Sequence, residues 1–98
     1  MNIKVKNLSG GISLITINEP DTYNSLSYKN LKDLIRVFQK LDKDKNIKVI
    51  IIEGAGKGFS AGHNLREVKN LKRKNRYQEL FNLCSKLMLQ IVEGKKPV

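Results

Sequence analysis

Residues 47–67, IKVIIIEGAGKGFSAGHNLRE, decide how this chain folds. The stretch opens with an almost unbroken run of β-branched apolar residues, at positions 47 and 49–52. A strand with a single buried face would alternate apolar and polar residues. The run therefore predicts that the strand over residues 47–53 is covered on both faces, as in a parallel or mixed sheet.

A glycine-rich segment follows this strand, with glycines at positions 54, 56, 58 and 62. Glycine at that density allows tight turns and close approach of the backbone to other groups. Asn64, with Glu67 three residues later, is typical of a helix N-cap and its capping-box partner. This order of elements predicts unpaired backbone N–H groups, backed by a helix dipole, at the mouth of a sheet. Such groups can hold an anion or a developing oxyanion.

The flanking segments predict a hairpin before the strand and one helical region on each side of it. Two apolar segments, residues 1–6 and 11–17, surround a turn at residues 9–11. Ser27 is a candidate N-cap for an amphipathic helix that the polar loop at residues 42–46 ends. A second helical region begins at Leu65, has a charged break at residues 72–76, and ends near Gly94. Its apolar stripe comprises Tyr77, Leu80, Phe81, Cys84, Leu87, Met88 and Ile91.

Composition limits the class of protein. The 98 residues make one small domain, and 40% hydrophobic with 29% charged residues is typical of a soluble globular chain. No apolar run approaches the roughly 20 residues of a membrane span, and no secretory signal is recognisable at the N-terminus. Cys84 is the only cysteine, so we expect a reducing, cytoplasmic location. The net charge of +10 fits an anionic partner, or only a bias towards lysine, asparagine and isoleucine.

The chain resembles the first part of the crotonase superfamily, the enoyl-CoA hydratases and isomerases. Residues 17–20 (I-N-E-P) and 24–27 (N-S-L-S) are similar to the family's N-R-P…N-A-L-S segment. Residues 58–67 (G-F-S-A-G-H-N-L-R-E) resemble its F-S-A-G-A-D-L-K-E motif, and residues 96–98 (K-P-V) the start of K-P-V-I-A-A-V-N-G. The resemblance implies a partial crotonase-type (ClpP/crotonase-like) α/β fold with a mixed sheet and packed amphipathic helices, spanning residues 1–98.

The resemblance also implies the roles of particular residues. The backbone N–H of His63 would be one of two oxyanion donors that polarise a thioester carbonyl, a type of interaction that lowers the barrier to enolate formation. Contacts with the coenzyme A part of the substrate are implied for Thr22, Asn24, Ser60, Ala61, Gly62, Asn64 and Leu65. No separate cofactor and no metal are implied, since coenzyme A belongs to the substrate.

The sequence departs from the family pattern in several places. His63 replaces a small residue and Asn64 replaces the common aspartate, although a backbone donor tolerates a changed side chain. Asp21 lies near a position that is often basic. In the family the second oxyanion donor and the two catalytic glutamates lie beyond the position of Val98. The resemblance therefore predicts acyl-CoA binding with incomplete catalytic machinery.

The same residues allow other interpretations. His63 could be a base or a metal ligand, but no second ligand lies at a useful spacing. Cys84 lies on an apolar helix face, which fits a core residue. Glu67 could be a catalytic base, but its place in the first turn after an Asn N-cap is explained by capping. The basic residues from Arg66 to Arg76 fit a solvated helix face best. A coenzyme A phosphate site, which Lys57 could join, is the second interpretation, and a nucleic-acid site is the third.

Two functions from different classes follow. The first is the acyl-CoA-binding part of an enoyl-CoA hydratase or isomerase of fatty-acid metabolism. In this hypothesis a downstream chain completes the domain, and the completed protein is a homo-oligomer. The alternative is a small basic module that binds nucleic acid or another anionic partner, which lacks support from any base-stacking aromatic platform. We expect no membrane partner, and an isolated chain that is marginal and prone to associate through its open sheet edge.

Overall fold

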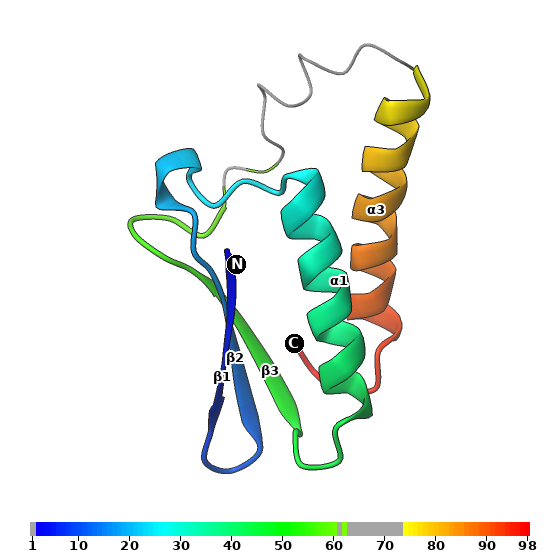
Figure 1. The fold of residues 1–98 in the computed structure, drawn as a ribbon. Coiled ribbons are helices and arrows are strands. Elements are labelled where there is room, and N and C mark those ends of the chain that lie inside the picture. The colour runs from blue at the N-terminus through cyan, green and yellow to red at the C-terminus, as the bar shows by residue number, and fades with distance from the viewer. Residues whose placement is uncertain (1, 61, 63–73) are drawn as a thin grey trace.

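The computed structural model describes residues 2–60, 62 and 74–98. A hairpin, β1 (Ile3–Leu8) and β2 (Ile12–Ile17), is followed by the short 3-10 helix η1 (Pro20–Thr22) and by α1 (Tyr28–Lys43). Strand β3 (Val49–Gly54) and helix α3 (Lys74–Glu93) complete the described elements. Figure 1 shows the three strands side by side, with α1 and α3 running along them.

The strands form one mixed sheet in the order β1-β2-β3. Strands β1 and β2 are antiparallel, and β2 pairs with β3 in parallel, with Ile15 opposite Ile52. The predicted hairpin is confirmed. Gly10 and Gly11 form its turn with φ of 81° and 79°, a conformation that side chains resist. The parallel pair is possible because α1 carries the chain back across the sheet.

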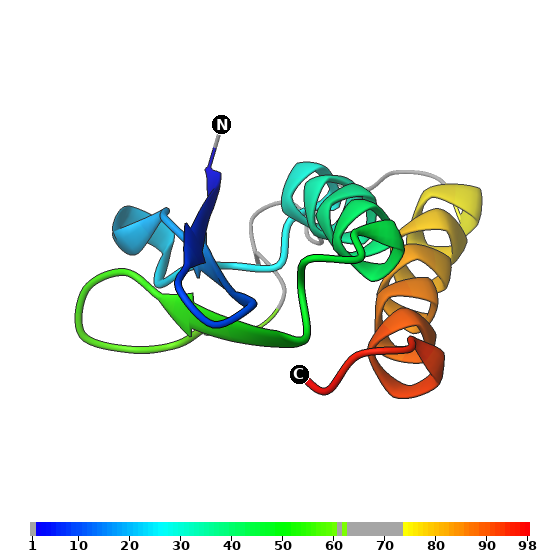
Figure 2. The ribbon, with the colours of Figure 1, turned by 90° about the horizontal axis from the view of Figure 1, so that it is seen from below.

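Helix α1 begins where the sequence predicts. The Ser27 hydroxyl accepts a hydrogen bond from the Asn30 backbone N–H at 3.1 Å, which satisfies one of the free donors of the first turn. The helix buries one apolar stripe: Leu31, Leu34, Ile35, Phe38 and Leu41. Together with Ile3, Ile15, Ile17 and Ile50 from the sheet, these residues form the core. Figure 2 shows α1 beside the sheet, and α3 packed on the far side of α1.

Helix α3 agrees with its predicted stripe in part. Leu80 and Leu87 are buried, and Cys84 contacts the core from a half-buried position, as expected. Phe81 and Met88, which the pattern places on the same stripe, are exposed. The prediction of a charged break at residues 72–76 is wrong for residues 74–76, because these residues already belong to α3. The predicted helix start at Leu65 and the Asn64–Glu67 capping box lie outside the described residues.

The prediction that β3 is covered on both faces is wrong. Ile50 is 2% exposed, whereas its neighbour Ile51 is 45% exposed, and burial alternates along the strand. Both described helices lie on the same side of the sheet (Figure 2). An apolar run alone does not show how many layers cover a sheet, so the pattern could not reveal this.

The last residues of the chain lie beside the free edge of β3. The Ile50 backbone N–H donates to the Pro97 carbonyl oxygen at 2.9 Å, on the side of β3 away from β2. Lys96 fixes this segment, because its ammonium group donates to the carbonyl oxygens of Leu41 and Asp44 at the end of α1. The expected α/β fold with a mixed sheet and packed amphipathic helices is confirmed. Neither described helix is long and apolar enough to cross a membrane.

Candidate functional site

The candidate site lies where β2 and β3 end, between two irregular segments. One is the turn at residues 18–25, which contains η1 and is called the Glu19 turn here. The other is the glycine loop, residues 54–62, of which Ala61 is not described. The parallel pairing of β2 with β3 brings the two segments to the same edge of the sheet, as Figure 1 shows.

Two consecutive non-glycine residues of the Glu19 turn are left-handed. Tyr23 has φ of 53° and Asn24 has φ of 55°, and each such residue costs about 1 kcal/mol or more relative to ordinary backbone conformations. Asparagine tolerates this conformation better than most residues, whereas for tyrosine the conformation is unfavourable. The turn must therefore be held by contacts around it.

The Asn24 side chain supplies most of those contacts. It is 1% exposed, and its amide oxygen accepts a hydrogen bond from the Glu19 backbone N–H at 2.9 Å. Its amide nitrogen donates to the carbonyl oxygens of Ala55 at 2.8 Å and Gly58 at 3.1 Å. One buried side chain thus joins the Glu19 turn to the glycine loop.

Ser60 makes a second connection between the two segments. Its hydroxyl donates to the Asn24 carbonyl oxygen at 2.6 Å and accepts from the Gly62 backbone N–H at 3.1 Å. The Gly62 carbonyl oxygen in turn accepts from the Leu26 N–H at 2.6 Å. These bonds fix the backbone at Ser60 and Gly62, and Gly62 precedes the predicted oxyanion donor, residue 63, in the sequence.

Gly54 shows how closely the loop folds back on the strand end. A Cβ atom at this position would lie 2.6 Å from both the Gly58 carbonyl oxygen and the Asn24 amide nitrogen, and against the Phe59 carbonyl oxygen. Any side chain would therefore push the loop away from the Glu19 turn. Glycine at position 54 is required by this close approach, as the glycine density of the sequence suggested.

Glu19 is the residue of this region that the sequence analysis missed, since it was interpreted only as part of a turn. One carboxylate oxygen accepts from the Asn2 side chain at 2.6 Å. The other accepts from the Thr22 hydroxyl at 2.7 Å, the Ser25 hydroxyl at 3.2 Å and the Asn30 amide at 3.3 Å. The only signal in the sequence was a dense polar segment, N-E-P-D-T-Y-N-S, ahead of a helix.

A cavity of about 430 Å³ lies between the Glu19 turn and the glycine loop. Its lining is Pro20, Asp21, Tyr23, Asn24, Ala55, Gly56, Lys57 and Gly58. The Asn24 side chain is already hydrogen-bonded to the glycine loop. The charged side chains that line the cavity are those of Asp21 and Lys57. Backbone groups of the glycine loop make up much of the remaining wall, which suits a ligand that is recognised by shape and main-chain hydrogen bonds.

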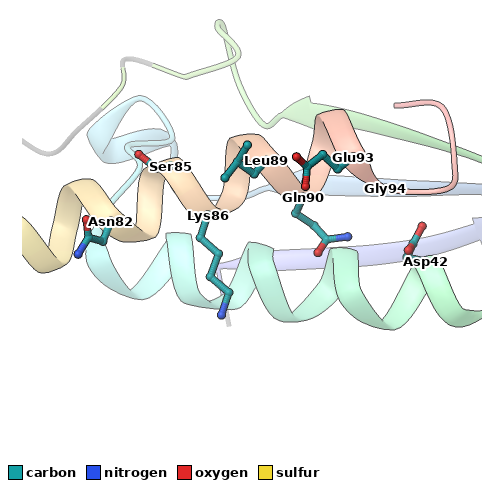
Figure 3. A pocket seen from close by; sticks show the side chains of 8 residues that line it. All are labelled: Asp42, Asn82, Ser85, Lys86, Leu89, Gln90, Glu93 and Gly94. Carbon is teal, nitrogen blue, oxygen red and sulfur yellow. The ribbon is translucent and has the colours of Figure 1, made fainter.

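Other cavities lie at the opposite end of the molecule. One of about 550 Å³ is lined by residues of α3 and the end of α1 (Figure 3), among them Asn82, Lys86, Gln90 and Asp42. Asp42 is already engaged there, because its carboxylate accepts the Lys95 backbone N–H at 2.7 Å. Within residues 2–60, 62 and 74–98 there is no cluster of side chains that could hold a metal ion.

The structure brings together four of the predicted site residues: Thr22, Asn24, Ser60 and Gly62. The Asn24 and Ser60 side chains are hydrogen-bonded across the two segments, whereas the Thr22 hydroxyl bonds to Ser25 within its own turn. Of the four, Asn24 lines the cavity, and the predicted coenzyme A contacts stay predictions. His63, Ala61, Asn64 and Leu65 lie outside the described residues, as do Glu67 and the basic run up to position 73. Their predicted roles stay predictions.

Comparison with known proteins decides the family. The family model described as enoyl-CoA hydratase/isomerase matches residues 7–98. The chain belongs to the enoyl-CoA hydratase/isomerase family. The predicted crotonase resemblance is therefore confirmed.

Individual relatives agree with this assignment. The chain is 39% identical to a probable peroxisomal enoyl-CoA hydratase 1 of Arabidopsis thaliana over 69 residues, or 70% of this chain and 26% of that protein. It is 40% identical to mitochondrial enoyl-CoA hydratase domain-containing protein 3 of Xenopus laevis over 78 residues, 80% of this chain and 26% of that protein.

Solved structures show the same fold. An enoyl-CoA hydratase of Mycobacterium smegmatis superimposes with a TM-score of 0.95 at 30% identity, covering all of this chain and 38% of that one. Human enoyl coenzyme A hydratase domain-containing protein 3 gives a TM-score of 0.92 at 33% identity and the same coverage. The chain thus spans about a quarter to two-fifths of the length of these relatives.

Proposed function

We propose that this chain is an acyl-CoA-binding part of an enoyl-CoA hydratase/isomerase-like protein, and that the 98 residues alone are catalytically incomplete. The thioester part of the substrate would lie against the glycine loop near His63. The coenzyme A part would occupy the cavity between the glycine loop and the Glu19 turn. Fixed backbone N–H donors at this position would polarise the thioester carbonyl.

The observation that carries the proposal is the clamp that Asn24 and Ser60 form between the two segments. A loop that donates backbone N–H groups to a carbonyl must be held in place before the substrate arrives, because preorganised donors need no rearrangement during the reaction. The hydrogen bonds of Asn24 to Ala55 and Gly58, and of Ser60 to Asn24 and Gly62, provide that restraint. They also leave a cavity beside the loop.

Catalytic incompleteness is inferred from the carboxylates. Hydration needs an acid or base within hydrogen-bond reach of the substrate. Glu19 lies in the Glu19 turn, and its two carboxylate oxygens accept four side-chain hydrogen bonds. Glu53 accepts a hydrogen bond from Thr16 at 2.8 Å. Both carboxylates are therefore occupied in structural contacts. Asp21 lines the cavity, which this proposal assigns to the coenzyme A part of the substrate and not to the thioester.

The binding proposal is tested by titrating the chain with crotonyl-CoA in a calorimeter. Lys57 lines the cavity at the glycine loop, whereas Lys45 lines a different cavity beyond the end of α1. Lys57→Glu and Lys45→Glu change the net charge equally, so nonspecific attraction falls equally in both variants. We expect Lys57→Glu to weaken binding about tenfold, as loss of a close charge contact does, and Lys45→Glu to change it less than about twofold.

The alternative function is separated in the same series. Binding of a single-stranded DNA oligomer that is tight and falls steeply with salt, without any affinity for crotonyl-CoA, would favour the basic binding module. Equal weakening of crotonyl-CoA binding by both lysine variants would show that the cavity is not the site.

Catalysis is tested by assaying the purified chain for hydration of crotonyl-CoA, with Glu67→Gln as a second sample. We expect no measurable turnover in either. General acid–base catalysis contributes about 10²–10⁴-fold and one oxyanion donor about 10²–10³-fold, so loss of both leaves little above background. Robust turnover that the Glu67→Gln change abolishes would identify Glu67 as the base and contradict the proposal.

A further inference from the structure

The exposed side of α1 carries a row of basic side chains. They recur every three or four residues and are called the basic stripe here: Lys29, Lys32, Arg36, Lys40 and Lys43. At about 100° per residue, the five fall within an arc of roughly 80° around the helix axis. All five are exposed, and no exposed residue of α1 is acidic. The stripe therefore presents charge of one sign along almost the whole helix.

The carboxylates of α1 do not neutralise the stripe. Asp33 is 8% exposed, and its Oδ1 atom lies 3.9 Å from the Arg36 guanidinium, close to the limit of about 4 Å for an ion pair. The Asp42 carboxylate accepts the Lys95 backbone N–H at 2.7 Å. The Lys32 ammonium lies 5.3 Å from the centre of the Tyr28 ring, a contact that leaves its charge in place. The cations of the stripe are thus available to an anionic partner.

The stripe continues into a basic cavity beyond the end of α1. This cavity has a volume of about 560 Å³, and its lining is Asp42, Lys43, Asp44, Lys45, Ile47, Lys48, Lys95 and Lys96. The Asp44 carboxylate accepts the Asn46 backbone N–H at 2.9 Å, and the Lys96 ammonium donates to backbone carbonyl oxygens of Leu41 and Asp44. The other four lysines of the lining form no ion pair with a described residue. The positive surface therefore extends past the helix into a concave site.

The length of this surface indicates the kind of anion that fits it. The stripe is about 21 Å long, at about 1.5 Å per helical residue. One strand of a duplex carries a phosphate about every 3.4 Å, so about six phosphates of that strand would span the five cations. A single phosphate or carboxylate would contact only part of the stripe. The neighbouring aromatic residue, Tyr28, packs against the core and offers no platform for stacking bases.

We propose that the basic stripe and the adjoining basic cavity bind the phosphate backbone of a nucleic acid without regard to base sequence. The contacts are ion pairs between lysine or arginine and phosphate, which position a nucleic acid but do not read its bases. This surface shares no residue with the cavity at the glycine loop. The inference therefore adds a second binding function and does not depend on acyl-CoA binding.

The chain offers matched lysines for the test. Lys29 and Lys40 lie about three helical turns apart on the same line of α1. Lys6 is also exposed, but it alternates with Ile3 and Val5 in β1 and pairs with Leu14, on the side of the sheet away from α1. Fluorescence anisotropy measures binding of a labelled single-stranded DNA oligomer as salt is raised. The samples are the wild type, Lys29→Gln, Lys40→Gln, their double variant and Lys6→Gln.

We expect the wild type to bind the oligomer and to release it steeply as salt rises. Lys29→Gln and Lys40→Gln should each weaken binding about threefold and make the slope of log K against log salt shallower by about 0.7, the value for one phosphate contact with a single strand. The double variant should show about twice that change in slope, and Lys6→Gln should behave as the wild type. Equal circular dichroism melting curves show that the losses are not unfolding.

The outcomes that overturn the proposal are distinct. The wild type may not fail to bind the oligomer, and Lys6→Gln must not lose as much affinity as Lys40→Gln. Binding to phosphatidylserine vesicles without binding to the oligomer would assign the stripe to an anionic membrane surface instead. Crotonyl-CoA binding by Lys40→Gln should stay within about twofold of the wild type, because charges farther apart than the Debye length are screened. Parallel losses for the oligomer and crotonyl-CoA would mean nonspecific attraction of anions and would also overturn the proposal.

Discussion

The Glu19 turn differs in what it leaves unsatisfied from the sheet face that is turned away from α1. That face is called the open face and comprises Leu8, Ile12, Leu14, Val49 and Ile51. In the turn, the buried side chains of Asn24 and Ser25 make hydrogen bonds to the surrounding backbone and to Glu19. The amide nitrogen of Asn30, in the first turn of α1, joins them, whereas the Asn30 amide oxygen has no hydrogen-bond partner. On the open face, the three exposed residues are apolar and no described element covers them. One region is closed by its own contacts, whereas the other lacks a covering layer.

This difference has a physical reason. Hydrogen bonds within the turn need only residues that are close in space at one end of the sheet, and all of them are present. Burial of a second sheet face needs an additional layer of secondary structure. The contacts between the Glu19 turn and the glycine loop are therefore formed by the described residues themselves, whereas one face of the sheet is not covered by them.

The largest expected effect compares two adjacent isoleucines on opposite faces. Ile50→Ala removes a core side chain and should lower the free energy of unfolding by about 3 to 4 kcal/mol, from lost burial and a cavity. Ile51→Ala, on the open face, should lower it by less than about 1 kcal/mol. Urea unfolding of both variants measures the difference. Similar losses would mean that Ile51 is buried in solution and that the open face is covered.

A smaller effect is expected where the glycine loop approaches the strand end. Gly54→Ala should lower the free energy of unfolding by about 3 kcal/mol, because its Cβ meets backbone atoms of the loop. Gly58→Ala is the matched control, since a Cβ there has no neighbour within 4 Å, and it should stay within about 0.5 kcal/mol of the wild type. Equal urea midpoints for the two variants would contradict the close packing of the loop.

The clamp itself is tested at Asn24. Asn24→Ala leaves two loop carbonyls and the Glu19 N–H without their partners and should lower the free energy of unfolding by about 2 kcal/mol. Asn24→Gly loses the same hydrogen bonds, but glycine adopts the left-handed conformation without strain. Its loss in the free energy of unfolding should therefore be about 1 kcal/mol smaller than that of Asn24→Ala. Chemical denaturation ranks the two variants. The reverse order would show that conformation is not what limits this position.

The smallest effect is expected next to it, at Tyr23. This residue is left-handed like Asn24, but its side chain is exposed. Tyr23→Gly should therefore raise the free energy of unfolding by about 0.5 kcal/mol, the strain relief being partly offset by the greater freedom of glycine in the unfolded chain. Thermal melting detects the shift. A clear loss of stability would reveal a structural contact of the tyrosine ring.

Local sequence signals predicted most of the fold because each has a local physical cause. Gly10 and Gly11 permit the hairpin turn, Ser27 caps α1 through a bond three residues away, and the stripe from Leu31 to Leu41 has the helical period. The same holds for the requirement for glycine at position 54. The resemblance implied that the segments of Asn24 and Ser60 form two sides of a coenzyme A channel. The structure shows a hydrogen bond between the two residues, and the channel itself stays a prediction.

The sequence by itself determined the hairpin, the capped helix, the glycine loop and the family, since these depend on residue type and spacing along the chain. Only the tertiary structure decided that Glu19 collects four side-chain hydrogen bonds, because its partners lie 3 to 17 residues away and meet through the fold. Only the tertiary structure, too, separated Ile50 from Ile51. Two identical neighbours in an apolar run differ only in which side of the sheet the helices cover, and that is a property of packing.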